Sequence, residues 1–225
     1  MPKHYVIGLG GVGTHLMESL KRIESWRDIV CIDGDRFEEK NMDRQLFDAK
    51  HLGMNKAKAM AERHGLGLGF SAHYFSRNLL RLEKSDWLWC AADNHACRRE
   101  VLAACDQYRC RAIIMANEYV DAEAYYFAPS MAGTPNDPRV FYPEINTDRS
   151  GDPLGPPGCV EAAKQRPQLV LANALAADLG CWIYWHWTRT IKDIPEDAWE
   201  FSPVHLKANP MALRTIKLGD RLKGE

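Results

Sequence analysis

The sequence has no cysteines in C-x-x-C spacing and no marked excess of either charge. Its seven cysteines form an odd set, which is not the framework of a disulfide-stapled domain and favours a reducing compartment. Lysine and arginine total 29 against 30 acidic residues, a formal net charge of −1. This balance excludes a global field that would hold nucleic acid or an anionic membrane, so any anion must be bound by a local site.

A long, purely apolar run is also absent. The longest apolar stretch, Leu169 to Trp187, contains Asn173, Asp178 and His186, which would be costly in hydrocarbon. It is better interpreted as a buried helix. The chain runs from Met1 into a β-rich segment without the pattern of a signal peptide. We therefore expect a cytoplasmic protein with no membrane span.

The composition is sufficient for a packed core, with 46% hydrophobic residues in 225. Apolar runs with β propensity alternate with segments of helical spacing, which predicts an α/β fold with a mostly parallel, doubly wound sheet of Rossmann-like type. We expect one domain over residues 1–225. The strands are predicted at His4 to Gly8, Ile29 to Ile32, Phe70 to Phe75, Trp87 to Ala92 and Ala112 to Met115, and the helices at Thr14 to Arg22, Met54 to His64 and Ala96 to Tyr108.

The second part of the chain has a different pattern. Residues 129–167 are rich in proline, glycine, aspartate and asparagine, with little periodicity, which predicts a long exposed crossover loop. Gln168 to Ile191 follows with apolar residues at helical spacing. Short alternating apolar runs within residues 199–225 indicate a C-terminal hairpin.

A glycine-rich turn joins the first predicted strand to the first helix. Its residues, Gly8-Leu9-Gly10-Gly11-Val12-Gly13, fit G-x-G-x-x-G, in which small residues let backbone N–H groups approach a phosphate. Asp33 ends the next strand about twenty residues later, where a carboxylate can accept hydrogen bonds from ribose hydroxyls. These features indicate nucleotide binding, and an NAD-dependent enzyme would have them as well.

Three further segments distinguish nucleotidyl transfer from hydride transfer. They are Asp33-Gly34-Asp35, Asn41-Met42-Asp43-Arg44-Gln45 and Gly53-Met54-Asn55-Lys56. Attack on an α-phosphate builds negative charge on phosphate oxygens and on the departing pyrophosphate, and preorganised cations stabilise that charge. A hydride-transfer site has no such need for arginine and lysine beside phosphates.

The order of these segments resembles the ThiF, MoeB and ubiquitin-activating-enzyme family. The D-x-D segment and the following N-x-x-R-Q match at Asp33, Asp35, Asn41, Arg44 and Gln45. The G-x-x-K segment matches at Gly53 and Lys56, and a strand-ending D-N-x-x-x-R matches at Asp93, Asn94 and Arg98. With the glycine loop, four blocks span about the first hundred residues. The chain resembles a short, divergent member that lacks the zinc C-x-x-C motifs common in ThiF and MoeB.

The resemblance implies ATP-dependent adenylation of a carboxylate and assigns roles in it. Arg44, Gln45 and Lys56 would contact the phosphates, Asp33 the ribose, and Asp93 a Mg²⁺ ion. The glycine loop, Asp35, Asn41 and Asn94 would support nucleotide binding; its glycines are Gly8, Gly10, Gly11 and Gly13. The carboxylate at the end of a strand suits a hard cation such as Mg²⁺.

The usual substrate in this family is the C-terminal glycine of a ubiquitin-like or sulfur-carrier protein, and a homodimer is the expected assembly. Cys159, in Gly158-Cys159-Val160-Glu161, is a candidate for subsequent thioester formation. A cysteine in such a position is more often an ordinary loop thiol than a nucleophile. Asp93 could instead cap the helix that follows it, and Arg44 and Lys56 could be surface charges.

Two other functions are compatible with the same sequence. Many relatives contribute an arginine from helices before the first strand, whereas three residues precede His4 here. This motivates a catalytically weak scaffold subunit of an activating heterodimer. An NAD-dependent oxidoreductase is the other alternative, although no catalytic dyad accompanies the glycine loop.

Overall fold

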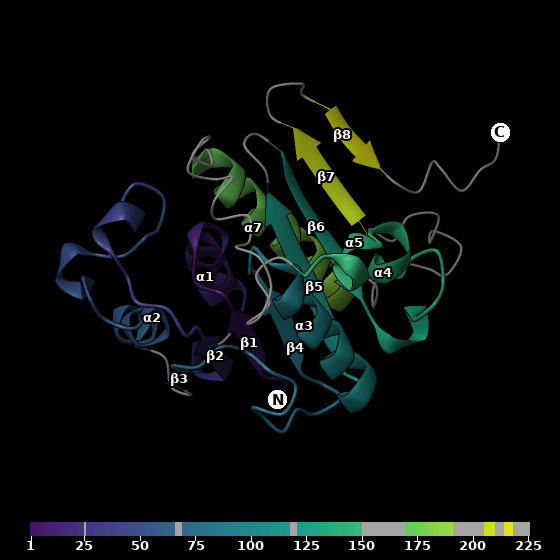
Figure 1. Ribbon diagram of the computed structural model, residues 1–225, viewed down its shortest axis with the longest axis horizontal. Coiled ribbons are helices and arrows are strands. Elements are labelled where there is room, and N and C mark those ends of the chain that lie inside the picture. The colour runs from purple at the N-terminus through teal and green to yellow at the C-terminus, as the bar shows by residue number, and fades with distance from the viewer. Residues whose placement is uncertain are drawn as a thin grey trace.

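The computed structural model describes residues 1–24, 26–65, 69–117, 121–149, 170–190, 205–209 and 214–217. Its centre is an eight-stranded sheet with the order β3-β2-β1-β4-β5-β6-β7-β8 (Figure 1). The strands are β1 (His4–Ile7), β2 (Ile29–Ile32), β3 (Phe70–Ser71), β4 (Trp87–Cys90), β5 (Arg111–Asn117), β6 (Ala122–Phe127), β7 (His205–Asn209) and β8 (Arg214–Lys217).

The sheet has a parallel and an antiparallel part. Strands β1 to β5 pair in parallel, and the register places Val6 beside Cys31 of β2 and Trp89 of β4. From β5 onward, each pairing is antiparallel. Strands β1 and β4 are buried along their whole length, as expected for a sheet covered on both faces. The prediction of a Rossmann-like α/β fold is confirmed.

Helices cover both faces of the sheet, and each face has its own apolar core. Side chains of α1, α2 and α7 pack into one core, whereas those of α3 and α5 pack into the other, with α4 at its margin (Figure 1). The helices are α1 (Gly11–Ile23), α2 (Lys56–His64), α3 (His95–Tyr108), α4 (Pro138–Phe141), α5 (Glu144–Thr147) and α7 (Val170–Trp185).

Short helical turns lie between these elements. The described 3₁₀ turns are η1 (Trp26–Asp28), η2 (Glu39–Asn41), η3 (Ala49–His51) and η4 (Pro129–Met131), and a π-helical turn, η5 (His186–Thr190), continues α7. In the part of the chain that is described, no helix has both the length and the apolar character needed to cross a membrane.

The structure corrects three sequence-based expectations. The strand predicted over residues 70–75 has only two paired residues, and β6 was not predicted at all. Residues 129–149, predicted as part of an exposed loop, contain η4, α4 and α5. Proline favours the start of a short helix, and the side chain of Ile145 is fully buried in the core, so packing orders this segment despite its loop-like composition. Residues 150–167 lie outside the described part.

The C-terminal hairpin is present as predicted. Strands β7 and β8 pair antiparallel, with Leu206 beside Lys217 and Asn209 beside Arg214. Strand β7 also pairs with β6, so the hairpin extends the sheet rather than standing apart from it.

Candidate functional site

The glycine loop lies at the carboxyl end of β1, against the segment that follows β4. Gly8 has φ +86°, and a Cβ built on it would lie 2.9 Å from the backbone nitrogen of Ala92. A Cβ on Gly13 would lie 2.0 Å from the carbonyl oxygen of Gly8. In both cases the Cβ would clash with a backbone atom, so these two positions require glycine. The loop therefore lies directly beside the segment that carries Asp93.

Helix α1 begins in this loop without a side-chain cap. Its N-cap residue, Gly10, has no side chain to accept a hydrogen bond, whereas Asn55 caps α2 and Asn94 caps α3. The Thr14 hydroxyl donates to the carbonyl of Gly10 at 3.0 Å. The first N–H groups of a helix have no intrahelical acceptor and attract anions. The N-terminus of α1 is thus suited to a phosphate.

Asp33 connects the end of β2 to the glycine loop. One carboxylate oxygen accepts the N–H of Leu9 at 2.6 Å, and the other accepts the N–H of Asp35 at 2.8 Å. Burial raises the pKa of Asp33, although Lys56 and these backbone donors oppose that rise. Each oxygen keeps a second acceptor position. The predicted contact with ribose remains a prediction, and the structure adds that Asp33 holds the loop.

Asp35 is the centre of a second polar group at the same edge. It accepts the Tyr74 hydroxyl at 2.5 Å and the Lys56 ammonium at 3.2 Å. Burial acts to raise the pKa of Asp35, but the hydrogen bond from Tyr74 and the charge of Lys56 outweigh it, so the pKa is lowered. The Lys56 side chain is only 9% exposed. It is therefore a buried cation beside the loop, which argues against a solvated surface charge.

Tyr74 was not predicted as a site residue. Its ring lies over Gly34, where a Cβ would come within 2.9 Å of three ring atoms, yet the residue is 72% exposed. The hydrogen bond to Asp35, followed by burial, raises the pKa of Tyr74 to about 12. No local sequence pattern marks this tyrosine, because it follows β3 and meets the site only through tertiary packing.

Arg44 and Gln45, both predicted to contact phosphates, have different surroundings. Gln45 is buried, its Nε2 lies 4.0 Å from a Cβ position on Gly10, and its Oε1 has no hydrogen-bond partner among the described residues. The Arg44 guanidinium instead contacts the Lys40 carbonyl at 2.9 Å and the Asp43 carboxylate at 3.0 Å. Gln45 therefore lies against the glycine loop, whereas Arg44 makes contacts within its own segment.

Asn41 has a structural role within that segment. Its side-chain oxygen accepts the N–H of Glu38 at 3.2 Å, and its carbonyl accepts the N–H of Gln45 at 3.0 Å. Asn41 is buried. It fixes the turn that presents Gln45, and its predicted support of nucleotide binding stays a prediction.

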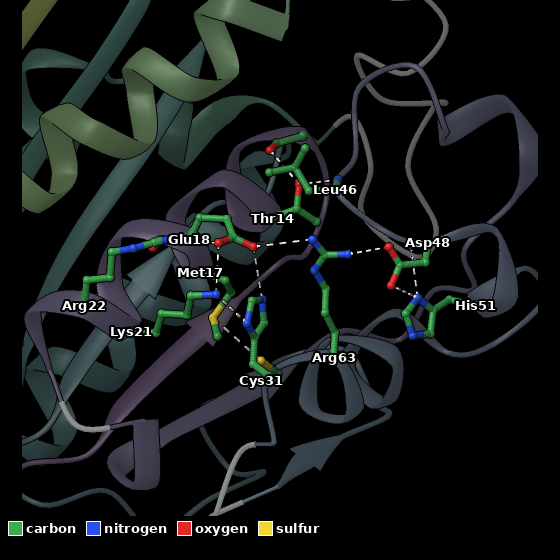
Figure 2. Close-up of polar contacts among 12 residues, drawn as sticks. Thr14, Met17, Glu18, Lys21, Arg22, Cys31, Leu46, Asp48, His51 and Arg63 are labelled. Atoms are coloured by element: carbon green, nitrogen blue, oxygen red, sulfur yellow. Dashed lines mark hydrogen bonds and ion pairs between the residues drawn. The ribbon is translucent and has the colours of Figure 1, made fainter.

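Polar contacts hold this segment against α1, as Figure 2 shows. The N–H of Leu46 donates to the Thr14 hydroxyl at 3.2 Å. Arg63 of α2 pairs with Asp48 at 2.8 Å and with Glu18 of α1 at 3.6 Å. Although each partly exposed ion pair is weak, together they connect α1, α2 and the segment that carries Gln45.

Asp93 and Asn94 follow β4 and have different surroundings. Asn94 accepts the N–H of Cys97 at 2.8 Å and caps α3, so the helix cap is Asn94 and the capping alternative for Asp93 is wrong. Asp93 is exposed and has no hydrogen-bond or ion-pair partner among the described residues. Its carboxylate is thus available at the carboxyl end of a parallel strand, where α/β sheets bind ligands.

Arg98 lies one turn further along α3. Its Nε is buried without a hydrogen-bond partner, and the described residues offer its guanidinium no carboxylate within ion-pair distance. The hydroxyl of Tyr125 is likewise buried and unpaired within the described residues. Buried donors without acceptors are costly, so both groups are candidates for contact with a bound molecule. Cys159 lies outside the described residues.

The fold is that of a Rossmann-like α/β domain, with the glycine loop at the carboxyl end of β1. The model of the ThiF family matches residues 2–136. The chain belongs to the ThiF family. No curated protein matches the chain.

Solved structures of Escherichia coli MccB share the fold. MccB with ATP has a TM-score of 0.67 at 15% identity and aligns with 96% of this chain and 63% of its own. MccB with AMPCPP and selenomethionine MccA has a TM-score of 0.64 at 17% identity, with 96% and 62% covered. This chain therefore spans a little under two thirds of the length of MccB.

Proposed function

We propose that this protein binds ATP and adenylates the C-terminal carboxylate of a peptide or small protein. The observation that carries the proposal is the convergence of three features at the carboxyl ends of β1, β2 and β4. These are the uncapped N-terminus of α1, the buried cation Lys56, and the exposed carboxylate of Asp93, which has no hydrogen-bond or ion-pair partner in the part of the chain that is described. Together they suit the phosphates and the metal of a nucleoside triphosphate.

The described residues fit Mg²⁺-ATP. A side chain at Gly8 or Gly13 would meet backbone atoms, so the loop stays narrow enough for its N–H groups to approach a phosphate. The carboxylate of Asp93 is the kind of hard oxygen ligand through which a protein holds Mg²⁺ together with substrate phosphates. When bound, the ion would neutralise charge on the phosphate oxygens.

The proposed reaction is a displacement at the α-phosphorus of ATP. An oxygen of the substrate carboxylate attacks the α-phosphorus, the bond from that phosphorus to the bridging oxygen of the β-phosphate breaks, and pyrophosphate departs with that oxygen. The products are an acyl-adenylate and pyrophosphate, with no net proton transfer. Lys56 and the N–H groups of α1 stabilise the charge that grows on the phosphates. Arg44 assists if its guanidinium leaves the Lys40 carbonyl.

The acceptor is proposed to be a chain terminus. MccB has been crystallised with the peptide MccA, and the family resemblance points to the C-terminal glycine of a ubiquitin-like or sulfur-carrier protein. Arg98, whose Nη1 contacts the His95 imidazole at 3.5 Å and whose Nε has no hydrogen-bond partner among the described residues, is suited to a carboxylate or a backbone carbonyl of this tail. A cytoplasmic homodimer, with thioester formation at Cys159 as a subsequent step, completes the proposal.

ATP/pyrophosphate exchange tests this function. The protein is incubated with labelled pyrophosphate, ATP and a candidate peptide or ubiquitin-like partner, and exchange is compared between wild type and Asp93→Ala. We expect partner-dependent exchange that falls by about 100-fold or more in the variant, with a nearly unchanged unfolding midpoint because Asp93 makes no hydrogen bond or ion pair among the described residues.

Glu62→Ala, which removes an exposed carboxylate from α2, is the matched control and should exchange as wild type does. Full activity in Asp93→Ala would refute the metal assignment. Absence of exchange with every partner, together with intact ATP binding, would favour the scaffold function. Tight NAD binding that ATP does not compete away would favour an oxidoreductase.

A further inference from the structure

Helix α7 lies along α1 and points in the same direction. The Ser19 hydroxyl of α1 donates to Asp178 of α7 at 3.1 Å, and the Tyr184 hydroxyl of α7 donates to Glu24, the C-cap of α1, at 2.7 Å. The second contact lies further toward the C-terminus of both helices than the first, so the two helices are parallel. The start of α7 therefore lies beside the glycine loop, close to the carboxyl ends of the parallel strands (Figure 1).

Asn173, in the first turn of α7 as described, packs directly on the glycine loop. Its exposure is 0%, and a Cβ built on Gly11 would lie 2.3 Å from its Nδ2 and 2.7 Å from its Oδ1. Asn117, the last residue of β5, donates its amide to the Asn173 Oδ1 at 2.9 Å. The Asn173 amide is thus wedged between the end of the sheet and the first residue of α1.

The three atoms nearest to a Cβ on Gly11 all belong to the Asn173 side chain. The φ of Gly11 is not positive, and alanine is otherwise favourable in a helix. Gly13 differs, because the atom that a Cβ would meet there is the backbone oxygen of Gly8. The obstacle at Gly11 is a replaceable side chain, whereas the obstacle at Gly13 is fixed.

The same amide carries an unpaired donor. Within the described residues, Nδ2 of Asn173 is buried without a hydrogen-bond acceptor. Leaving a buried donor unsatisfied costs about 1–3 kcal/mol, and an apolar residue of similar shape would avoid that cost. Retention of a costly polar group beside a ligand loop is typical of a functional constraint rather than of optimal stability.

We propose that Asn173 is a positioning residue of the phosphate-binding loop. Held by Asn117, it fixes Gly11 and with it the direction of the first N–H groups of α1. Asn173 lies outside residues 2–136, which the family model matches, so the nucleotide site is completed from a second part of the chain. The inference rests on the proposed binding of ATP but not on the identity of the carboxylate.

A double-mutant cycle on the full chain tests the contact, with the Kd of ATP measured by calorimetry. Gly11→Ala should weaken ATP binding by about tenfold or more, because the new Cβ meets Asn173. Adding Asn173→Ala should recover part of the affinity that Gly11→Ala loses, because it removes the clash but not the need for Asn173 to position the loop. Gly13→Ala with and without Asn173→Ala is the control, and here no recovery is expected.

Asn173→Leu separates positioning from stability. Leucine keeps the branched shape but cannot accept the Asn117 hydrogen bond, so ATP affinity should fall by about threefold to tenfold while the unfolding midpoint stays the same or rises. A purely structural residue would instead lower the midpoint and leave the affinity of the folded protein unchanged.

The inference is overturned if the double variant binds ATP no better than Gly11→Ala, or if Asn173→Leu binds as wild type does. It is also overturned if the wild type binds no ATP. If the cycle shows the expected coupling between Gly11 and Asn173 in ATP affinity but the protein catalyses no pyrophosphate exchange, the inference stands and the proposed adenylation is rejected.

Discussion

The two parts of the sheet use buried polar groups in different ways. In the parallel part, Asp33 and Lys56 lie at the carboxyl ends of strands, around a loop that offers N–H groups. In the antiparallel part, Glu123 of β6 accepts the Tyr142 hydroxyl at 2.5 Å and pairs with His205 of β7 at 3.2 Å. The first arrangement lies beside the start of α1, whereas the second connects β6, the end of α4 and β7.

The Glu123 carboxylate receives two donors, although Nδ1 of His205 in the same group is buried without a partner among the described residues. Burial acts to raise the pKa of Glu123, but the hydrogen bonds from His205 and Tyr142 outweigh it and lower the value. At the parallel edge, the Gln45 oxygen and the Asn173 amide are buried without partners in the described chain. Satisfied groups stabilise a fold, and unsatisfied groups mark the places where a ligand can complete it.

Lys56→Met should give the largest effect. It should lower activity and leave stability nearly unchanged. The change keeps the length of the side chain and removes the cation beside the loop, so pyrophosphate exchange should fall by about 100-fold to 1,000-fold. Asp35 keeps its hydrogen bond from Tyr74, which limits the loss of stability.

Lys58→Met, on the exposed side of the same helix, is the matched control and should leave exchange intact. If Lys56→Met lost stability in proportion to activity, the proposed separation between the two parts of the sheet would not hold.

Glu123→Leu should have the opposite effect. It leaves the Tyr142 hydroxyl and the His205 imidazole without their acceptor in a buried setting, which should lower the free energy of unfolding by about 1–3 kcal/mol. ATP affinity should remain near that of wild type, because the group is distinct from the glycine loop. Chemical denaturation and calorimetry measure the two quantities.

The exposed Glu83→Leu provides the comparison for Glu123→Leu. A large loss of ATP affinity in folded Glu123→Leu would show that the antiparallel part contributes to the nucleotide site after all.

The smallest expected effect is a pH dependence from His64 of α2. Burial and the Lys21 ammonium, 3.0 Å from its Nδ1, lower the pKa of His64 to about 4, and Glu18 opposes them only in part. The unfolded chain, with a pKa near 6.5, therefore binds the proton more readily. The stabilising contribution is complete above about pH 6.5, and it is lost as the pH falls toward 4.

His64→Gln cannot titrate, so its stability should depend less on pH between 7 and 4.5. A difference on the order of 1 kcal/mol is expected in denaturation curves measured across this range. The exposed His73→Gln should retain the slope of the wild type. Equal slopes for His64→Gln and the wild type would exclude the assignment.

Much of the parallel part could be predicted from the sequence because its signals are local. The G-x-G-x-x-G turn lies between β1 and α1 as its spacing predicts, and Asn55 and Gly65 bound α2 as a cap and a left-handed terminus do. The elements after β5 were harder to predict. We found no local sequence signal for β6, and residues 129–149 have the composition of a loop although the side chain of Ile145 is buried in the core.

The candidate site was predicted in part for the same reason. Motif spacing identified Asp33, Lys56 and Asp93, but it could not say that Asn94 would cap α3 or that Arg44 would contact Lys40. The position of a long side chain depends on which carbonyls and carboxylates surround it, and spacing does not contain that information.

The sequence by itself determined the order of strands and helices in the parallel part, the glycine turn and the residues at the ends of the parallel strands, because hydrophobic period and turn chemistry act over a few residues. Only the tertiary structure decided that Tyr74 holds Asp35 and that Asn173 presses on Gly11. Those contacts join distant segments, which are brought side by side because helices bury an apolar core on each face of the sheet.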